Sequence, residues 1–285
     1  MGRCQRMVSY SVAVPRRQQN RGKNRSNKSF APSDSERRVG LARALSKLGI
    51  CSRSQACAWI ADGRVRLSGA TTRNPEAPVR IGVDRIEVDG QPAVAKNKIY
   101  LVLNKERGVV TTAADEKGRA TVYDFLPEQW KGPDARWIAP VGRLDKASEG
   151  LLLMTNDSEW AARITAPESH LDKIYHVQIA AIADDTLLDT LRGGVEDRGE
   201  FLTAKHAGLL RSGEKNSWVE VALDEGKNRH IRRMFESLGI EVLRLVRVSI
   251  GPLALGELQR GETRPLTPQE KSSIDRALTK RGSVR

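Results

Sequence analysis

Residues 142–157, GRLDKASEGLLLMTND, contain a run of apolar side chains that limits the possible folds of this chain. Leu151–Met154 are apolar without alternation, which is typical of a strand covered on both faces of its sheet. Asp145 precedes this strand by a short loop and stands between Arg143 and Lys146. A carboxylate in such a place must be paired or hydrogen-bonded. Asp145 therefore either caps a turn, which is common, or serves as a nucleophile.

The rest of the pattern predicts an α+β fold. Strand-like segments lie at 98–105, 150–156, 173–181, 217–224 and 243–250, and helical segments lie at 158–165, 184–192, 229–238 and 268–279. Because the strands come in runs and the helices do not strictly alternate with them, α+β is favoured over a doubly wound sheet. The longest apolar runs are far too short to cross a bilayer, so we expect a soluble protein with no membrane partner.

At 285 residues, the chain is long enough for two domains and a tail. Residues 1–38 hold ten Lys or Arg against two acids and lack apolar periodicity, which predicts a basic disordered tail. A transit peptide fits the same composition. Residues 39–95 are expected to form a small unit of two helices followed by strands, with Ser52 or Ser54 capping the second helix. Residues 96–285 form the larger domain.

The charge of the chain indicates a polyanionic partner. The formal net charge is +13 and the sequence pI is near 10, which makes nucleic acid the leading candidate. In the 39–95 unit, basic residues at polar positions predict an RNA-binding platform, although ordinary solvated charges would show the same spacing. These residues are Arg43, Lys47, Arg53, Arg64 and Arg66.

Common cofactor and metal motifs are missing from the sequence. It contains neither a phosphate-binding loop nor a Gly-x-Gly-x-x-Gly after a strand. The four histidines and three cysteines show no metal-ligand spacing. We therefore expect no cofactor and no metal, with any catalysis resting on ordinary side chains. Few cysteines also fit a reducing cytoplasm.

Two further segments carry candidate functional residues. In DKIYHVQIA (172–180), Lys173 and Tyr175 share one strand face with Val177 and Ile179. Tyr175 is either a core residue with its hydroxyl bonded or a ring that stacks on an RNA base.

The second segment, EGKNRHIRRMFESLGI (225–240), predicts a helix capped by Asn228. Its buried stripe is Ile231, Met234, Phe235 and Leu238. Arg229, Arg232, Arg233 and Glu236 follow the same spacing on an adjacent face. Arginine near a helix start is unfavourable to the helix dipole, so an acidic partner or an RNA phosphate is expected to compensate.

Three motifs of the chain resemble those of the RsuA-like bacterial ribosomal RNA pseudouridine synthases. In chain order they are the 142–157 stretch, the Lys-x-Tyr of KIYHV, and EGKNRHIRRM. The segment ahead of these motifs resembles the RNA-binding domain typified by ribosomal small-subunit protein four. Its sequence is RALSKLGICSRSQACAWIADGRVRLSG. The resemblance covers roughly residues 39–270. It implies a mixed, mainly antiparallel-sheet catalytic domain after the small RNA-binding domain.

The resemblance also implies residue roles. Asp145 matches the catalytic aspartate, Tyr175 matches the tyrosine that stacks on the target base and takes part in proton removal, and Arg232 matches the arginine that pairs with the aspartate. A nearby arginine would hold the carboxylate ionised, as a nucleophile requires. The residues expected to bind the substrate around them are Arg143, Lys173, Arg229 and Arg233.

The implied reaction is the isomerisation of uridine to pseudouridine in ribosomal RNA, with the large-subunit RNA favoured. The expected partner is ribosomal RNA or a pre-ribosomal particle, and the expected state is a cytoplasmic monomer. A non-catalytic RNA-binding factor in ribosome assembly is the main alternative, because the same basic surfaces would serve it. A DNA-binding transcription factor fits less well, because no convincing recognition helix is visible in the sequence.

Overall fold

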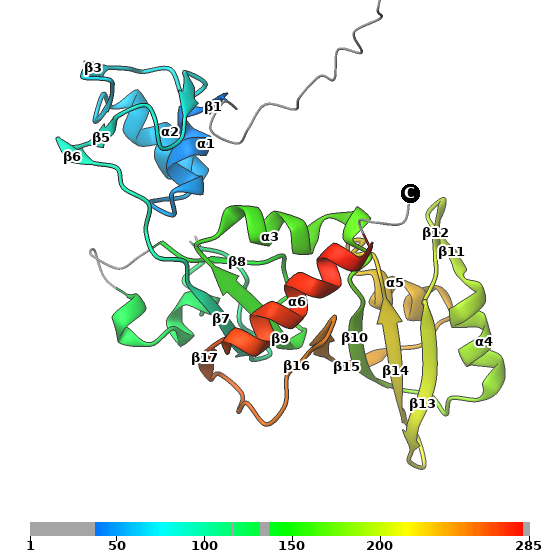
Figure 1. Ribbon diagram of the computed structural model, residues 1–285. Coiled ribbons are helices and arrows are strands. Elements are labelled where there is room, and N and C mark those ends of the chain that lie inside the picture. The colour runs from blue at the N-terminus through cyan, green and yellow to red at the C-terminus, as the bar shows by residue number, and fades with distance from the viewer. Residues whose placement is uncertain (1–37, 114, 116, 132–136, 282–285) are drawn as a thin grey trace, which may run out of the picture.

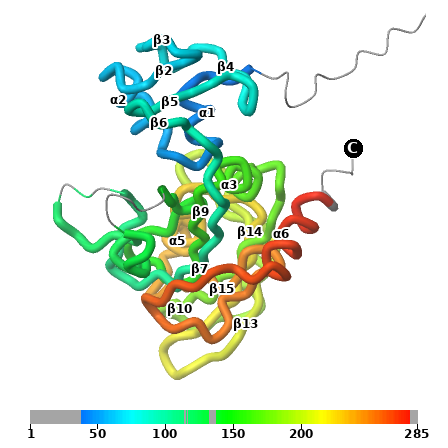
Figure 2. The backbone as a smooth tube through the Cα atoms, turned by 60° about the vertical axis from the view of Figure 1, so that its left-hand side comes forward, coloured from blue at the N-terminus to red at the C-terminus, as the bar shows by residue number. Residues whose placement is uncertain are grey.

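The computed structural model describes residues 38–113, 115, 117–131 and 137–281. The tail predicted at 1–38 lies outside the described residues except for Arg38. A small unit at the N-terminal end stands above a larger body built on a long sheet (Figures 1 and 2).

The N-terminal unit encloses its own apolar core between two helices and short strands. Ser52 caps the second helix, since its hydroxyl accepts a hydrogen bond from the Gln55 amide at 3.0 Å, which confirms that expectation. The elements are β1 (Arg38–Gly40), α1 (Leu41–Lys47), α2 (Arg53–Ala61), β2 (Val65–Leu67), β3 (Ala70–Thr71), β4 (Pro78–Arg80), β5 (Ile86–Val88) and β6 (Gln91–Pro92).

Within the described residues, the larger body is organised around a nine-stranded sheet in the order β13-β14-β10-β15-β9-β7-β17, with β16 beside β15 and β8 beside β9. All of these pairs are antiparallel except β15–β9. The predicted α+β fold with a mainly antiparallel sheet is therefore confirmed. The strands are β7 (Tyr100–Lys105), β8 (Ala139–Pro140), β9 (Glu149–Thr155), β10 (Lys173–Ile179), β13 (His206–Ser212), β14 (Ser217–Leu223), β15 (Val242–Ile250), β16 (Leu253–Ala254) and β17 (Thr263–Pro265).

Helices cover the sheet in two groups. One core joins β10, β14 and β15 to two helices, and another joins β7 and β9 to two others. The first pair is α4 (Asp185–Gly193) and α5 (His230–Ser237), and the second is α3 (Ser158–Thr165) and α6 (Pro268–Arg281). The remaining elements are the hairpin β11 (Val195–Asp197) and β12 (Glu200–Leu202), and the 3-10 helices η1 (Val122–Phe125), η2 (Glu128–Trp130) and η3 (Pro167–Ser169). No helix in the described ranges is long and apolar enough to cross a bilayer.

Strand β9 is covered on both faces, as its sequence predicts. Leu152 and Met154 pack with η1 and the segment around it, whereas Leu151 and Leu153 pack with α3 and α6. All four side chains are fully buried. The loop that carries Asp145 is thus attached to one of the most buried strands of the molecule.

Gly150 allows β15 to approach β9 closely. Its φ is +101°, and a Cβ there would lie 2.8 Å from the Arg247 nitrogen and closer still to the Arg247 carbonyl. The parallel contact is short, pairing Val246 with Glu149 and Arg247 with Gly150. Because only glycine tolerates this approach, Gly150 fixes where the two halves of the sheet meet.

Polar contacts join the N-terminal unit to the larger body. Lys47 at the end of α1 forms an ion pair with Glu159 of α3 at 2.5 Å. Lys98 Nζ donates a hydrogen bond to the Lys47 carbonyl at 2.8 Å, and Nδ2 of buried Asn156 lies close to Gly49. These contacts place the basic unit beside the N-terminal end of α3 (Figure 2).

Candidate active site

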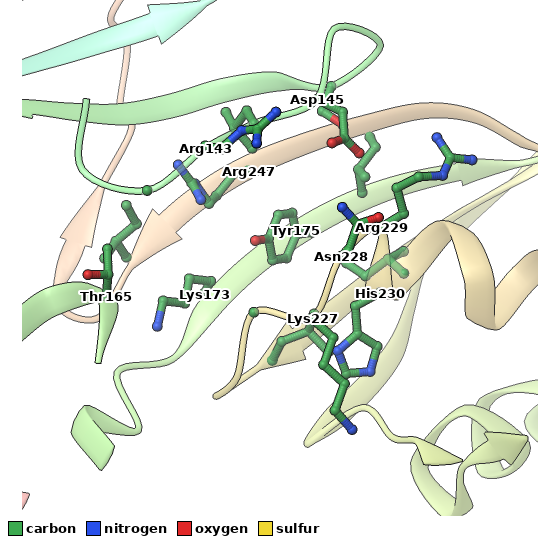
Figure 3. A pocket seen from close by; sticks show the side chains of 18 of the residues that line it. Arg143, Asp145, Thr165, Lys173, Tyr175, Lys227, Asn228, Arg229, His230 and Arg247 are labelled. Atoms are coloured by element: carbon green, nitrogen blue, oxygen red, sulfur yellow. The ribbon is translucent and has the colours of Figure 1, made fainter. Parts of the chain in front are cut away.

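A hollow of about 400 Å³ opens where the Asp145 loop, β10, β15 and the start of α5 converge (Figure 3). Asp145 and Tyr175, from segments 30 residues apart, both line it. Its lining residues with polar or charged side chains are Arg143, Asp145, Ser148, Thr165, Lys173, Tyr175, Lys227, Asn228, Arg229, His230 and Arg247.

Backbone hydrogen bonds hold the Asp145 loop in place. The Ser148 amide donates to the Asp145 carbonyl at 3.0 Å and closes a turn directly before β9. On the other side, the Gly108 amide donates to the Lys146 carbonyl at 2.7 Å, and the Thr111 hydroxyl donates to the Leu144 carbonyl at 2.8 Å. The half-buried Asp145 carboxylate is therefore carried on a fixed backbone.

Lys105 is a buried cation beneath this loop that the sequence analysis does not single out. Its ammonium donates to the carbonyls of Ser148, Glu106 and Asp145 at 2.8, 3.0 and 3.1 Å. Burial lowers the pKa of Lys105 to about 8, although the negative charges of Asp145 and Glu149 oppose this shift. A lysine that ends an apolar strand is the only signal in the sequence, and it does not reveal which loop the side chain supports.

Tyr175 lies in β10 between two partner strands. It is paired in register with Val221 of β14 and with Arg247 of β15. Val177 and Ile179, on the same face, are buried in the α4–α5 core, whereas Tyr175 is half-buried at the pocket. The shared strand face is thus confirmed, and the tyrosine ring lies between Asp145 and Lys173 in the view of Figure 3.

The Arg232 side chain contacts the backbone of the Asp145 loop and not the Asp145 carboxylate. Its Nη2 donates to the Ala147 carbonyl at 3.0 Å and its Nη1 to the Val242 carbonyl at 3.3 Å. Burial lowers the pKa of Arg232, as does the neighbouring charge of Arg229, while Asp145 opposes the shift. Among the described residues, no arginine lies within 4.0 Å of the Asp145 carboxylate, so the expected direct pair is not formed in this structure.

The start of α5 differs from the prediction. The N-cap is Arg229, in the left-handed conformation with φ +48° and without a side-chain cap, so the expectation that Asn228 caps the helix is wrong. Both residues line the pocket instead. Arg229 also forms an ion pair with Glu236 at 2.6 Å, which neutralises part of its charge.

Arg233 is the one expected substrate-binding residue that the structure does not bring to the pocket. It points to the β11–β12 hairpin, where it binds Asp197 at 2.6 Å and Glu200 at 2.7 Å. Two carboxylates satisfy its charge, so it stabilises the packing of α5 on the hairpin. Arg143, Lys173 and Arg229 do line the pocket.

The basic residues of the N-terminal unit lie on its surface, apart from the pocket. Arg43, Arg53 and Arg66 are exposed, and Lys47 is half-buried in its ion pair with Glu159. Arg64 forms an ion pair with Asp89 and lies 5.1 Å from the centre of the Trp59 ring.

Arg247 and His230 are buried pocket residues that the sequence analysis does not assign to the site. Both have buried nitrogens without a hydrogen-bond partner among the described residues. Burial lowers the pKa of His230. No group of three or more His, Cys, Asp or Glu side chains in the described ranges is arranged to hold a metal ion.

Comparisons with known proteins identify relatives of this chain. Residues 99–237 match the RNA pseudouridylate synthase family. The chain is 37% identical over 249 residues to ribosomal large subunit pseudouridine synthase B of Bacillus subtilis, covering 85% of this chain and 97% of that protein. It is 33% identical over 244 residues to an uncharacterised RNA pseudouridine synthase of Aquifex aeolicus, covering 84% and 95%. A crystal structure of a pseudouridylate synthase superposes with a TM-score of 0.58 at 30% identity, covering 84% of this chain and 99% of the other.

These similarities define an RNA-modifying isomerase. The chain belongs to the RNA pseudouridine synthase family, which confirms the resemblance to pseudouridine synthases drawn from the motifs after residue 95.

Proposed function

We propose that this pseudouridine synthase modifies a specific uridine of ribosomal RNA, with the large-subunit RNA favoured over the small-subunit RNA. The name of the Bacillus subtilis relative supports this choice, since the similarity extends over nearly all of that protein. On this proposal the enzyme is a cytoplasmic monomer that acts on free ribosomal RNA or a pre-ribosomal particle. It requires no cofactor.

The observation that carries the proposal is that Asp145 and Tyr175 line one pocket, Asp145 from a loop held by backbone hydrogen bonds and Tyr175 from β10 in the interior of the sheet. In the reaction, the bond between uracil N1 and the ribose C1′ breaks and a bond between C5 and C1′ forms. The proton on C5 leaves, and N1 takes up a proton. An aspartate carboxylate that attacks the target nucleotide allows the uracil to detach, rotate and rejoin.

The other pocket residues have distinct roles in this proposal. Tyr175 stacks on the flipped uracil and takes part in removing the C5 proton. Arg232 positions the Asp145 loop through the Ala147 carbonyl. Arg143, Lys173 and Arg229 bind the RNA around the target, which helps to offset the few kcal/mol that base flipping costs.

Residues 39–95 are proposed to form a separate RNA-binding domain ahead of the catalytic domain at 96–285. Their core is distinct from the cores of the larger body, and their exposed arginines suit phosphate contacts, which carry little sequence information. This domain would supply affinity and the pocket would supply the chemistry.

The variant Asp145→Asn tests the catalytic assignment. It keeps the size of the side chain but removes the anion, so we expect a folded, RNA-binding protein that releases no tritium from ribosomal RNA labelled at uridine C5. Asp145 holds the loop through its backbone carbonyl, which the substitution retains. Substantial tritium release by a well-folded variant would contradict the role of Asp145 and favour a non-catalytic RNA-binding factor.

A further inference from the structure

Within the described part of the chain, Arg247 is a buried cation without an acidic partner at the wall of the pocket. Only 6% of its surface is exposed. Its Nε donates to the Leu151 carbonyl at 2.7 Å, while Nη2 is shielded from solvent and has no acceptor among the described residues. A buried guanidinium that lacks an anion costs free energy, so a fold that keeps one requires an explanation.

The Arg247 guanidinium is held in place by the backbone of β9, and the carboxylate on that strand is already paired with another arginine. Gly150 brings the backbone of β9 against Arg247, and the Leu151 carbonyl then orients the side chain. Glu149, on the same strand, is already bound by Arg244 through two hydrogen bonds of 3.1 and 2.9 Å. Among the described residues, no acid lies within 4.0 Å of Arg247.

The surroundings of Arg247 are also positive. Of the described residues that line the pocket, Asp145 is the only acid, against five Lys or Arg. Lys227 and Arg229 are bound to Glu225 and Glu236, respectively. Arg143, Lys173 and Arg247 gather toward the Thr165 end in Figure 3, with Tyr175 between them and Arg229. This end of the pocket therefore suits an anion.

We propose that Arg247, together with Arg143 and Lys173, binds the phosphodiester adjoining the target uridine and so sets the base against Tyr175 and Asp145. The inference rests on the proposed function, since RNA supplies the anion. A guanidinium suits a phosphate because its planar array of donors matches two phosphate oxygens. The Leu151 carbonyl uses only Nε, so Nη1 would make this contact while Nη2 stays shielded from solvent.

A purely structural role for Arg247 predicts different behaviour. If the residue served only to clamp β9 through Leu151, its removal would weaken the fold and leave the number of RNA phosphates contacted unchanged. If it binds phosphate, its removal takes one contact away. The salt dependence of RNA binding distinguishes the two roles. When the logarithm of the binding constant is plotted against the logarithm of the salt concentration, each lost phosphate contact on a single strand lowers the steepness of the slope by about 0.7.

The experiment measures binding of a large-subunit rRNA transcript across salt concentrations, with Asp145→Asn as the background so that turnover does not interfere. We expect Arg247→Met to lower the slope by about 0.7–0.9 and Arg247→Lys to retain it. In the active enzyme, Arg247→Met should lower kcat/KM for tritium release at least tenfold. Arg211→Met, on β13 outside the pocket, is the matched control and should leave the slope and kcat/KM unchanged.

An unchanged slope for Arg247→Met, with or without loss of stability, would overturn the phosphate subsite. Arg247→Lys keeps the test valid if the Met variant fails to fold, because loss of the slope with a lysine in place would contradict a charge-based contact. If the unmodified enzyme binds the transcript but releases no tritium, the proposed function fails, and the slopes still decide whether Arg247 contacts a phosphate.

Discussion

Among the described residues, Lys105 is the most completely buried charged residue, with 1% of its surface exposed. Three backbone carbonyls, two of them from the loop at 145–148, surround its ammonium. The side chain thus supports the Asp145 loop at the cost of a buried charge. Such a combination is expected where a loop must hold a catalytic group in a fixed place.

The pKa of Lys105 gives a prediction for the pH dependence of stability. The pKa is about 8 in the folded chain and about 10.4 when unfolded. Below pH 8 both states bind the proton and the burial penalty is complete. Between about pH 8 and 10.4 the unfolded state binds more protons, so this residue makes unfolding less favourable as pH rises.

Comparison with Lys105→Met isolates this effect. We expect the free energy of unfolding of the unmodified protein to rise by up to about 3 kcal/mol relative to the variant between pH 7.5 and 10.5, measured by urea denaturation. A difference between the two proteins that stays constant over this range would contradict the buried-cation interpretation.

Substitutions of Tyr175 separate stacking from proton transfer. Tyr175→Phe keeps the ring against its two strand neighbours but removes the hydroxyl, so we expect near-normal RNA binding with product formation stalled. Tyr175→Leu should also weaken binding by roughly 1–3 kcal/mol, because base stacking is lost. RNA titration and tritium release measure the two effects. Full turnover by the Phe variant would leave stacking as the only role.

The β9–β15 contact is the element-scale feature on which the pocket depends. It joins the strand that follows Asp145 to Arg247 on β15, and the residues paired in the contact are 97 positions apart in the sequence. Only two residue pairs form it, and Gly150 is one of the four residues involved. A small change at this position should therefore affect both stability and the geometry of the site.

Gly150→Ala tests this contact. The new methyl group would clash with the Arg247 backbone while φ remains at +101°, so we expect a loss of more than about 1 kcal/mol in unfolding free energy and a fall in kcat/KM. Gly256→Ala is the matched control, because its φ is also positive at +63° but no atom lies within 4 Å of the added Cβ. Equal losses in the two variants would show that backbone conformation, rather than the clash, determines the effect.

Elements with local periodicity were predictable from the sequence, and contacts between distant segments were not. The apolar run of β9 and the stripe of α5 follow directly from the spacing of their side chains. The sequence does not predict strand β13, because Leu209 and Leu210 are adjacent and both exposed, so the alternation typical of a strand fails there. The cap of α5 was misassigned because Arg229 adopts a left-handed conformation that its residue type does not suggest.

The residues of the candidate site also fall into those that the sequence indicates and those that only the fold reveals. Asp145 and Tyr175 were found because they stand in recognisable motifs, and both line the pocket. Lys105 and Arg247 were missed because their roles depend on which carbonyls and which strand the fold brings to them. Arg233 lies away from the pocket, because Asp197 and Glu200 bind it, and helical spacing does not reveal that contact.

At the scale of the whole molecule, positive charge is concentrated toward the N-terminus. Of the net +13, residues 1–38 carry +8, residues 39–95 carry +3 and the remaining residues carry +2. The pocket that Asp145 lines thus lies on the part of the chain with the smallest net charge. Long-range attraction of RNA should come mainly from residues 1–95.

Removal of residues 1–95 should weaken RNA binding and leave the larger body folded. The deletion removes the ion pair between Lys47 and Glu159, but the Glu159 carboxylate is largely exposed and water can solvate it instead. Asn156 loses its packing beside Gly49 and keeps its hydrogen bonds to Ile99 and Asn97. Near-normal kcat with a raised KM is therefore expected, measured by tritium release beside a melting curve.

The salt dependence of binding shows whether the lost affinity comes from phosphate contacts. Each contact removed should lower the log–log slope by about 0.7–0.9. The full-length variant with Arg43, Arg53 and Arg66 changed to glutamine is the control, because these exposed residues can lose their charge without disturbing the core of the unit. It should reproduce part of the change in slope. If the truncation leaves the slope unchanged, the N-terminal unit does not bind phosphate, and RNA attraction must arise from the pocket and its surroundings.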